Sequence, residues 1–316
     1  MIADESALAW SFVVPNYNGE AVIAACVDAM LAAAARSRFP GEIIIVDDAS
    51  SDRSADIIAQ YSDRAKLIRL EKNCGFSTAC NAGISAARGS AVILINNDVS
   101  VYPDIIDIAL ASLQPPDVFA VSFRALDENG NLRIGRTLPS FKKGFLKGAP
   151  DERETMPDAD TRPAFFASGG GAAFGADKLR ALGGFDENMN PFYWEDVDLS
   201  FRALRRGWNI VYDPACVVLH PSHGVISSSR RAREVNVISR RNQLIFFWKN
   251  ADCPRMWAGH IFFVALKALS GCLTFRFDYL KSLAGAARLA GPIAAFRRKE
   301  KKLSVRSSRD IIQLFR

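Results

Sequence analysis

Short apolar runs alternate with amphipathic stretches along the first hundred residues. Because each run ends at polar or turn residues, we expect buried strands at 11–14, 43–46, 66–70 and 92–95. The stretches at 20–35, 52–61 and 77–87 have apolar positions spaced for helices with one packed face. Ser50 or Ser51 is predicted to cap the second of these helices. This alternation predicts an α/β fold with right-handed βαβ units and a mostly parallel central sheet flanked by helices.

Polar side chains follow the predicted strands directly. Asn18, Asp47, Asp48 and Asp98 each come after an apolar run, and the carboxyl ends of parallel strands form the edge where ligands bind. A carboxylate after the second strand can accept from the N–H of a pyrimidine base, and Asp98 can hold a divalent cation, because hard cations take oxygen ligands. The alternatives are a plain turn at 96–98 and helix capping by Asp47 or Asp48. Capping explains one acid but not the acids or amides after three strands.

The middle of the chain loses this regularity. Residues 124–163 are rich in Gly, Pro and charges and are predicted to form an irregular excursion over the sheet. The excursion is either a loop that closes on a bound ligand or a plain surface insertion. Phe165 and Phe166 then predict a short strand that ends at three glycines, 169–171, which allow a ligand to approach the backbone closely. A tight turn is the alternative, and no Walker-type loop is present because no Lys-Ser or Lys-Thr follows.

A helix with two acids in its first turn is predicted after Trp194. Its packed face comprises Val197, Phe201 and Leu204, and it ends in a basic turn before Gly207. Acids at a helix start are favoured by the helix dipole, which alone could explain Glu195 and Asp196. One of these carboxylates could instead take the proton from an acceptor hydroxyl. The dipole lowers its pKa, whereas nearby phosphates raise it.

Composition limits the classes of function. The 316 residues, with 49% hydrophobic content, can bury the core of one large domain with an appendage. The formal charge of +6 belongs to the C-terminal part, since residues 276–316 hold eleven Lys or Arg and three acids. Six cysteines without C-x-x-C spacing favour reduced thiols in the cytosol over disulfides or a zinc site. The first residues carry acids where a signal peptide needs positive charge, so no export is expected.

The chain beyond residue 250 has a different character. Residues 257–273 are apolar but are interrupted by His260 and Lys267 and fall short of a comfortable span, so a helix in the membrane interface is predicted. Aromatic residues among cations continue to Lys299, as on a surface that touches anionic lipid. Packing on the rest of the chain or on another subunit is an equal alternative. Nucleic acid is disfavoured because no nucleic-acid motif accompanies the basic tail.

Several motifs stand in an order and spacing that resemble a known family. They are Pro-Asn-Tyr-Asn at 15–18, Val-Asp-Asp-Ala-Ser-Ser-Asp at 46–52, Asn-Cys-Gly-Phe at 73–76 with Asn-Ala-Gly at 81–83, Asn-Asn-Asp at 96–98, Gly-Gly-Phe-Asp-Glu at 183–187 and Trp-Glu-Asp-Val-Asp-Leu at 194–199, followed by His220. Together they resemble the family-two inverting glycosyltransferases of the GT-A fold over about residues 11–250. The family's Asp-x-Asp signature begins with Asn96 here, which resembles the branch that transfers rhamnose or related sugars to bacterial surface polysaccharides and leaves less charge for a metal.

The resemblance implies a role for each matching residue. Asp196 would be the general base, and Asp98 would hold Mg²⁺ or Mn²⁺, with His220 on the metal or the diphosphate. The acceptor would face Gly170, Gly171, Trp194 and Glu195. The donor nucleotide sugar would meet Pro15, Tyr17, Asn18 and Asp47 at its base, Asn73, Phe76 and Asn81 near its ribose and phosphates, and Asp48, Gly75, Asn96, Asn97 and Asp98. His223 could assist phosphate or acceptor, and the task of Arg240-Arg241-Asn242 stays open.

The sequence therefore predicts an inverting glycosyltransferase with a GT-A domain at 1–250 and a basic helical extension at 251–316. The donor would be UDP- or dTDP-linked rhamnose, galactose or a similar sugar. The acceptor would be a hydroxyl of a lipid-linked cell-surface glycan at the cytoplasmic face of the inner membrane, and an oligomer is open. A sugar nucleotidyltransferase is one rival, disfavoured because no Gly-rich basic loop follows the first strand. The other is a non-catalytic nucleotide-binding membrane adaptor, which donor hydrolysis with Mn²⁺ would exclude.

Overall fold

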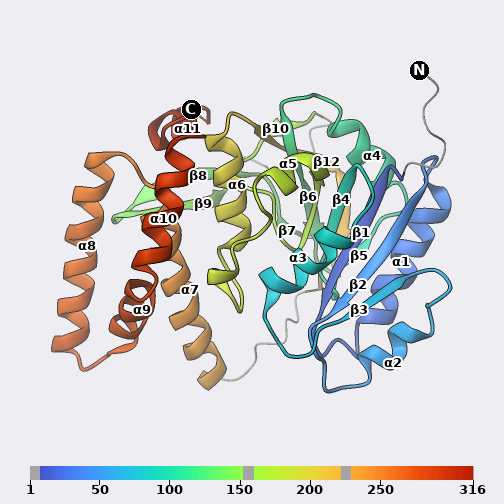
Figure 1. The fold of residues 1–316 in the computed structure, drawn as a ribbon, viewed down its shortest axis with the longest axis horizontal. Helices are drawn as coiled ribbons and strands as arrows, with labels where there is room; N and C mark the ends of the chain where they lie inside the picture. The colour runs from blue at the N-terminus through green and yellow to red at the C-terminus, as the bar shows by residue number, and fades with distance from the viewer. Residues whose placement is uncertain (1–7, 152–159, 222–228, 316) are drawn as a thin grey trace.

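A single mixed sheet crosses the centre of the protein (Figure 1). The computed structural model describes residues 8–151, 160–221 and 229–315. The sheet has ten strands in the main order β10-β12-β6-β11-β4-β1-β2-β3, with β5 paired to β12 and β7 to β6. Its strands are β1 Trp10–Asn16, β2 Gly41–Asp47, β3 Lys66–Arg69, β4 Ala91–Ile95, β5 Ser100–Val101, β6 Val118–Leu126, β7 Leu132–Ile134, β10 Arg162–Pro163, β11 Gly171–Gly175 and β12 Asn209–Leu219. A separate hairpin consists of β8 Thr137–Lys142 and β9 Phe145–Pro150.

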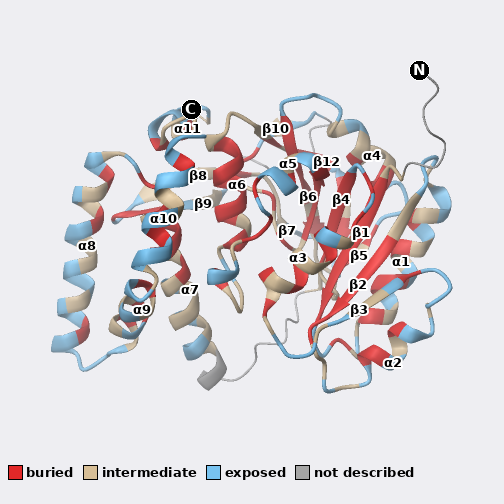
Figure 2. Cartoon of the chain, in the orientation of Figure 1, coloured by how far each residue is buried: buried red, intermediate tan, exposed pale blue. Residues whose placement is uncertain are grey.

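Helices cover both faces of this sheet. They are α1 Ile23–Arg36, α2 Ser54–Ala59, α3 Phe76–Ala86, α4 Ile105–Ser112, α5 Ala176–Ala181, α6 Glu195–Arg205, α7 Ser229–Asn250, α8 Pro254–Leu273, α9 Asp278–Ala287, α10 Ala290–Lys301 and α11 Ser308–Gln313, with a short 3₁₀ helix at Glu187–Met189. Alternate residues of the central strands enter two separate cores, one with α1 and α4 and the other with α3, α6 and α7. Burial is therefore almost continuous along these strands (Figure 2).

The parallel arrangement expected for the first hundred residues is confirmed. β1 pairs in parallel with both β2 and β4, and β2 with β3. The helix predicted at 52–61 is present as α2, but its predicted cap is wrong. Arg53 occupies the N-cap, and its side chain makes no capping hydrogen bond. Ser50 and Ser51 instead bond to residues of the neighbouring strand-end loops.

Two predictions for the middle of the chain are also wrong. Phe165 and Phe166 lie outside the strands, and the strand is β11, which starts at the third glycine and runs antiparallel between β4 and β6. The two phenylalanines serve as packing anchors, and Phe165 N–H donates to the carbonyl of Thr137. The excursion at 124–163 is also less irregular than expected, because β6 continues to Leu126 and the β8–β9 hairpin forms within it. Residues 152–159 of this stretch lie outside the described part of the chain.

The C-terminal helices pack on the rest of the protein. Arg206 of α6 forms an ion pair with Glu300 of α10 at 2.7 Å, and Arg205 donates to the carbonyl of Asn250. Within the described residues, α8 is the one helix long and apolar enough to cross a membrane. All six cysteines are free thiols in this structure.

Candidate active site

A cleft of about 320 Å³ opens at the carboxyl ends of β1 and β4, and we call it the strand-end cleft. It is lined by Pro15, Asn16, Tyr17, Asp48, Asn73, Gly75, Phe76, Ala79, Asn96, Asn97, Asp98, Pro191 and Phe192. Most residues predicted to bind a donor therefore meet at one place. The location follows from the fold, because parallel strands bring their carboxyl ends to one edge of the sheet.

Two buried oxygen atoms without a partner mark the end of β4. Asn96 Oδ1 and Asp98 Oδ1 are both inaccessible and accept no hydrogen bond. His220, at the end of β12, places its Nε2 3.6 Å from Asp98 Oδ2. Burial raises the pKa of Asp98, but the hydrogen bond and charge of His220 and the charge of Arg133 outweigh it, so the pKa lies below its ordinary value. Buried polar atoms are normally satisfied, and these two point to a missing partner.

A divalent cation fits this donor set. One carboxylate, one amide oxygen and one imidazole are ligands that Mg²⁺ or Mn²⁺ can accept. No group of three or more His, Cys, Asp or Glu side chains that could hold a metal occurs among the described residues. In the set proposed here, Asn96 contributes an amide where the family signature has an acid.

The adjacent acids Asp47 and Asp48 have different surroundings. Asp47 is completely buried below the cleft and accepts from Asn16 Nδ2 at 2.9 Å and Ser50 Oγ at 2.5 Å. Asp48 lines the cleft and accepts from the backbone N–H groups of Cys74 and Gly75 at 2.7 and 2.8 Å. Asp48 therefore shapes the cleft wall, and Asp47 supports the loop beneath it. Capping of α2 explains neither acid, since Ser54 N–H donates to Asp52.

The loop after β1 is also partly structural. Tyr17 is exposed at the cleft, where an aromatic ring can stack on a base. Asn18 does not line the cleft, because its Oδ1 accepts from the N–H of Ser51 at 2.9 Å. Asn97 lines the cleft and donates to Asn16 Oδ1 at 2.8 Å.

The start of α3 forms another wall. Gly75 precedes the helix with φ +92°, and a Cβ there would meet Asn190 and Pro191 at less than 3 Å. Phe76 lines the cleft beside Asn73. Asn81, predicted near the ribose and phosphates, points elsewhere: its amide group donates to Phe185 carbonyl and accepts from Phe185 N–H. Asn81 therefore joins α3 to the loop before α6.

Asp196 lies next to the cleft, separated from it by one backbone segment. Its Oδ2 accepts from Gly169 N–H at 3.2 Å, and a Cβ on Gly169 would stand 3.2 Å from Phe76. A Cβ on Gly170 would lie 3.4 Å from Asn96 Nδ2 and 3.8 Å from His220 Cε1. The backbone of these two glycines therefore passes between Asp196 and the end of β4. A side chain on Gly169 would contact Phe76 and Asp196, and one on Gly170 would contact Asn96 and His220. Gly171 is buried inside β11 against Phe123 and Val218 and does not reach the cleft.

Burial raises the pKa of Asp196 against the lowering effect of hydrogen bonds from Gly169 and Val197. A carboxylate with a raised pKa is a stronger base, which suits proton removal from a hydroxyl. Glu195 is buried, its Oε2 has no partner, and burial together with the charge of Asp196 raises its pKa well above the ordinary value. Glu195 therefore does not form an open surface for an acceptor in this structure.

The turn before α6 is backbone-strained. Tyr193 and Trp194 have φ of 74° and 76°, a conformation that bulky residues rarely adopt. Trp194 Nε1 donates to Ser239 Oγ of α7 at 3.2 Å. Strain of this kind persists where surrounding contacts impose it, often at functional sites.

Sequence reasoning did not identify the loop at 190–192, although Pro191 and Phe192 line the cleft. Asn242 of α7 is fully buried and donates to the carbonyls of Phe192 and Tyr193 at 3.0 and 2.9 Å. Arg241 donates to the carbonyl of Asn190. Arg241 and Asn242 therefore hold the loop at 190–193 in position. The signal in the sequence that could have identified this role was the Arg240-Arg241-Asn242 motif. His223 lies outside the described residues.

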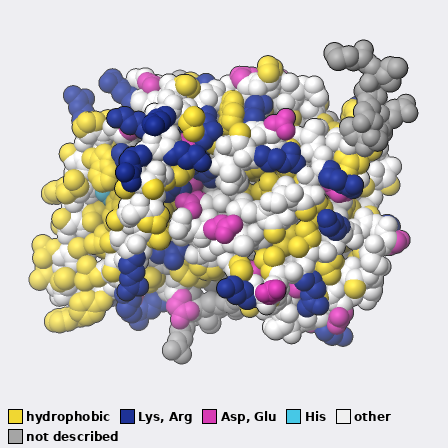
Figure 3. Space-filling model, viewed as in Figure 1, with side chains coloured by type: hydrophobic (Ala, Val, Ile, Leu, Met, Phe, Trp, Pro, Cys, Tyr) yellow, Lys and Arg dark blue, Asp and Glu magenta, His cyan; other side chains and the backbone are white. Residues whose placement is uncertain are grey.

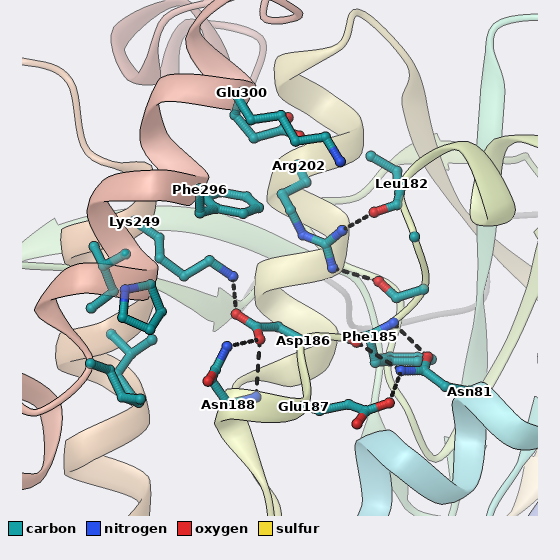
Figure 4. Close-up of a pocket in the computed structure, with 17 residues that line it drawn as sticks. Asn81, Leu182, Phe185, Asp186, Glu187, Asn188, Arg202, Lys249, Phe296 and Glu300 are labelled. Carbon is teal, nitrogen blue, oxygen red and sulfur yellow. Dashed lines mark hydrogen bonds and ion pairs between the residues drawn. The ribbon is translucent and has the colours of Figure 1, made fainter.

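A second cavity, of about 360 Å³, lies between α6, α7 and α10, and we call it the lysine cavity (Figure 4). Lys249 donates there to Asp186 at 2.5 Å and to Asp198 at 2.9 Å. Arg202 also pairs with Asp198 at 2.9 Å and donates to two carbonyls. The Gly-Gly-Phe-Asp-Glu motif and the last acid of 194–199 therefore join the helices to one another.

Residues 11–183 match the family model described as Glycosyl transferase family 2. The chain belongs to this family. The match covers the cleft residues from Pro15 to Asp98, and it ends before Pro191, Phe192, Asp196 and His220.

Two relatives and one solved structure illustrate the family's range. The chain is 32% identical over 145 residues to the succinoglycan biosynthesis protein ExoO of Rhizobium meliloti, covering 42% of this chain and 41% of that protein. It is 28% identical over 205 residues to the N-acetylglucosaminyl-diphospho-decaprenol L-rhamnosyltransferase of Mycobacterium tuberculosis, covering 57% and 66%. The chain thus spans less than two thirds of either relative. A structure of GalNAc-T7 with UDP, GalNAc and Mn²⁺ superposes with TM-score 0.60 at 17% identity, covering 79% of this chain and 49% of that one, which confirms the GT-A fold.

Proposed function

We propose that this protein is an inverting glycosyltransferase that moves a sugar from a UDP- or dTDP-linked donor to a hydroxyl of a lipid-linked cell-surface glycan. The observation that carries the proposal is the pair of unpartnered oxygens, Asn96 Oδ1 and Asp98 Oδ1, in a cleft one glycine segment away from Asp196. Rhamnose is the favoured sugar, because the relative named as a rhamnosyltransferase aligns over 57% of the chain. Galactose or a similar sugar is compatible with the same cleft.

The donor would occupy the strand-end cleft. Tyr17 would stack on the base, with Asp48 at the wall beside it. Asn96, Asp98 and His220 would hold Mg²⁺ or Mn²⁺, and such a cation, when bound, supplies positive charge that stabilises a departing diphosphate. Burying two polar oxygens without hydrogen-bond partners is unfavourable unless a ligand satisfies them.

Asp196 would act as the general base. Its carboxylate would take the proton from the acceptor hydroxyl while that oxygen forms a bond to the anomeric carbon. The bond between that carbon and the diphosphate breaks in the same step, and its electron pair leaves with the diphosphate. Configuration is therefore inverted without a covalent enzyme intermediate. The hydrogen bond from Gly169 N–H orients the carboxylate toward the cleft side of α6.

The remainder of the chain would serve acceptor access. We assign residues 1–250 to the catalytic domain and 251–316 to an extension that packs on α6 and α7. A lipid-linked acceptor places the enzyme at the cytoplasmic face of the inner membrane as a peripheral protein. The rival reading as a sugar nucleotidyltransferase gains no support, since no basic glycine-rich loop follows β1.

Asp196→Asn tests the proposal while keeping the side chain nearly isosteric. UDP should still raise the melting temperature, because the cleft is intact. Transfer should fall by about 10²-fold or more, the usual contribution of a general base. Asp177→Asn is the matched control, since Asp177 is a fully exposed carboxylate in the first turn of α5. Turnover at the wild-type rate in Asp196→Asn would contradict the assignment, and a panel of UDP-, dTDP- and GDP-sugars would identify the donor.

A further inference from the structure

The hairpin β8–β9 and helix α8 form one continuous surface, although they are more than a hundred residues apart. His260 Nδ1 lies 2.7 Å from the carbonyl of Gly144, and the ring of Phe145 meets His260 edge-on with centroids 5.0 Å apart. Lys267 Nζ stands 4.3 Å from the centre of the Phe145 ring. We call this unit, 137–150 with 254–277, the hairpin–helix surface.

This surface is apolar and positively charged. Ile261, Phe262, Leu266, Leu269, Leu273, Phe275 and Phe277 are exposed large hydrophobic residues on it. Figure 3 shows hydrophobic side chains gathered over α8, bordered by Lys and Arg. Its charged residues are Lys142, Lys143, Lys147, Arg255, Lys267 and Arg276, and it contains no Asp or Glu. None of these six cations forms an ion pair with a described carboxylate.

The cations also lie close enough to repel one another. Burial lowers the pKa of Lys267, and the charges of Arg240, Lys143 and Lys147 lower it further. Like charges kept together at a surface favour an anionic partner. They disfavour a second copy of the same surface, because a twofold dimer would place cations against cations.

Two residues on this surface are poorly suited to their backbone conformation. The turn between β8 and β9 consists of Lys143 and Gly144, with φ of 50° and 74°. Positive φ at both positions defines a type I′ turn, in which Asn, Asp or Gly normally precedes the glycine. A lysine is disfavoured there, because its Cβ lies too close to the following carbonyl oxygen in this conformation. The fold alone gives no reason for a lysine at this tip.

The end of α8 repeats this pattern. Arg276 N–H donates to Gly271 carbonyl at 2.9 Å and Phe275 N–H to Cys272 carbonyl at 3.3 Å, which is a Schellman motif. Its left-handed position normally holds Gly or Asn, but here it is Phe275, with φ 55° and 81% exposure. Each strained position therefore presents the kind of side chain, one cationic and one aromatic, that the rest of the surface shows. Such strain indicates a role outside folding.

We propose that the hairpin–helix surface docks the protein onto an anionic lipid bilayer, with the apolar face of α8 in the headgroup region and the hairpin lysines on lipid phosphates. Apolar residues flanked by cations are the pattern of helices that lie in a membrane interface. α8 lies on the membrane and does not cross it, because the hairpin covers one side of the helix at His260. The proposal deepens the membrane-associated part of the proposed function and rests on it.

The docked orientation would bring the acceptor-side elements near the bilayer. Figure 1 places the C-terminal end of α8 and the first turns of α7 on the same side of the molecule. Asp278, directly after Phe277, pairs with Arg233 near the start of α7 at 2.6 Å. α7 is the helix whose Asn242 holds the cleft loop at 192–193. A lipid-linked acceptor would thus reach the strand-end cleft without leaving the membrane surface.

Co-sedimentation with vesicles tests this inference on the full chain, with phosphatidylglycerol and phosphatidylcholine mixed or phosphatidylcholine alone. The wild-type protein should bind the anionic vesicles and release as salt is raised. Lys143→Asn should weaken binding about fivefold and Phe275→Asn about tenfold, from one lost charge and one lost aromatic anchor. Both variants should melt at or above the wild-type temperature, since Asn suits both turns. Lys66→Gln and Phe39→Asn, exposed residues away from this surface, are the matched controls and should bind as wild type.

Three outcomes would overturn the inference: equal binding to both kinds of vesicle, wild-type binding by the two variants, or lower melting temperatures for them. A dimer in light scattering that Phe275→Asn dissociates, without vesicle binding, would assign the surface to a second copy. The assay contains neither donor nor acceptor. If the wild-type protein does not bind vesicles, the Asp196→Asn test of the proposed function is unaffected. If the protein does not transfer a sugar, the vesicle-binding test is unaffected.

Discussion

The strand-end cleft and the lysine cavity are similar in size and rich in motif residues, yet their polar atoms are in opposite states. In the lysine cavity Lys249, Asp186 and Asp198 satisfy one another. In the strand-end cleft, Asn96 Oδ1 and Asp98 Oδ1 have no partner. Buried charges that pair with one another hold elements of the fold together. Buried polar atoms without a hydrogen-bond partner indicate a site for a ligand. A family motif can therefore contain residues that bind a ligand or residues that stabilise the fold. The two kinds differ in whether their buried polar atoms have hydrogen-bond partners within the protein.

Removing the cation of the lysine cavity should give the largest change in stability. Lys249→Met leaves Asp186 without its cation and Asp198 with only Arg202 and Asn250. Breaking a buried ion pair in this way costs about 3–5 kcal/mol. Urea unfolding of the variant measures this loss, and Lys302→Met, an exposed lysine, is the control. An unchanged urea midpoint for Lys249→Met would show that the cavity is not a structural element.

Asn81 sharpens the comparison, because the sequence placed it in the cleft and the structure places it at the lysine cavity. Asn81→Ala removes the bonds to Phe185 and should lower the free energy of unfolding by about 1–3 kcal/mol. The affinity for UDP, measured by calorimetry, should not change. Weaker UDP binding by Asn81→Ala with an unchanged free energy of unfolding would show instead that Asn81 belongs to the donor site.

The smallest effect concerns the protonation of Glu195. Burial raises its pKa, so the folded protein keeps this proton where the unfolded chain has lost it, and stability falls as pH rises above about 4.5. Glu195→Gln removes this loss, so its stability relative to wild type should increase from pH 4 to pH 8. Melting curves across this range provide the measurement. Asp127→Asn should show the opposite trend, because hydrogen bonds from Asn131 lower the pKa of Asp127. Parallel curves for Glu195→Gln and wild type would contradict the buried, protonated carboxyl.

Local patterns predicted the parallel part of the sheet and the polar residues at its edge. The run at 92–95 and the acids after Trp194 led directly to the β4 end and to the first turn of α6. The pattern could not separate Asp47 from Asp48, because neighbouring residues at a strand end point in different directions. It also missed the β8–β9 hairpin, whose Lys-Gly turn lacks the usual Asn-Gly or Asp-Gly signal.

Partners distant in sequence were beyond local reasoning. Lys249 meets Asp186 and Asp198 across 63 and 51 residues, and Asn242 meets Phe192 across 50. Nothing in the local spacing of either motif specifies such a contact, because it depends on how α7 docks against α6. The sequence therefore located the reacting groups better than the residues that hold them in place.

Mn²⁺ affinity in the presence of UDP, measured by electron paramagnetic resonance, tests the central claim most directly. Asp98→Asn should weaken Mn²⁺ binding by at least about tenfold, since even residues that only orient a metal ligand contribute that much. Its melting temperature without metal should fall only slightly, because Asp98 Oδ1 has no partner and Oδ2 has only the 3.6 Å contact with His220. Wild-type Mn²⁺ affinity in Asp98→Asn would contradict the assignment of the unpartnered oxygens to a cation.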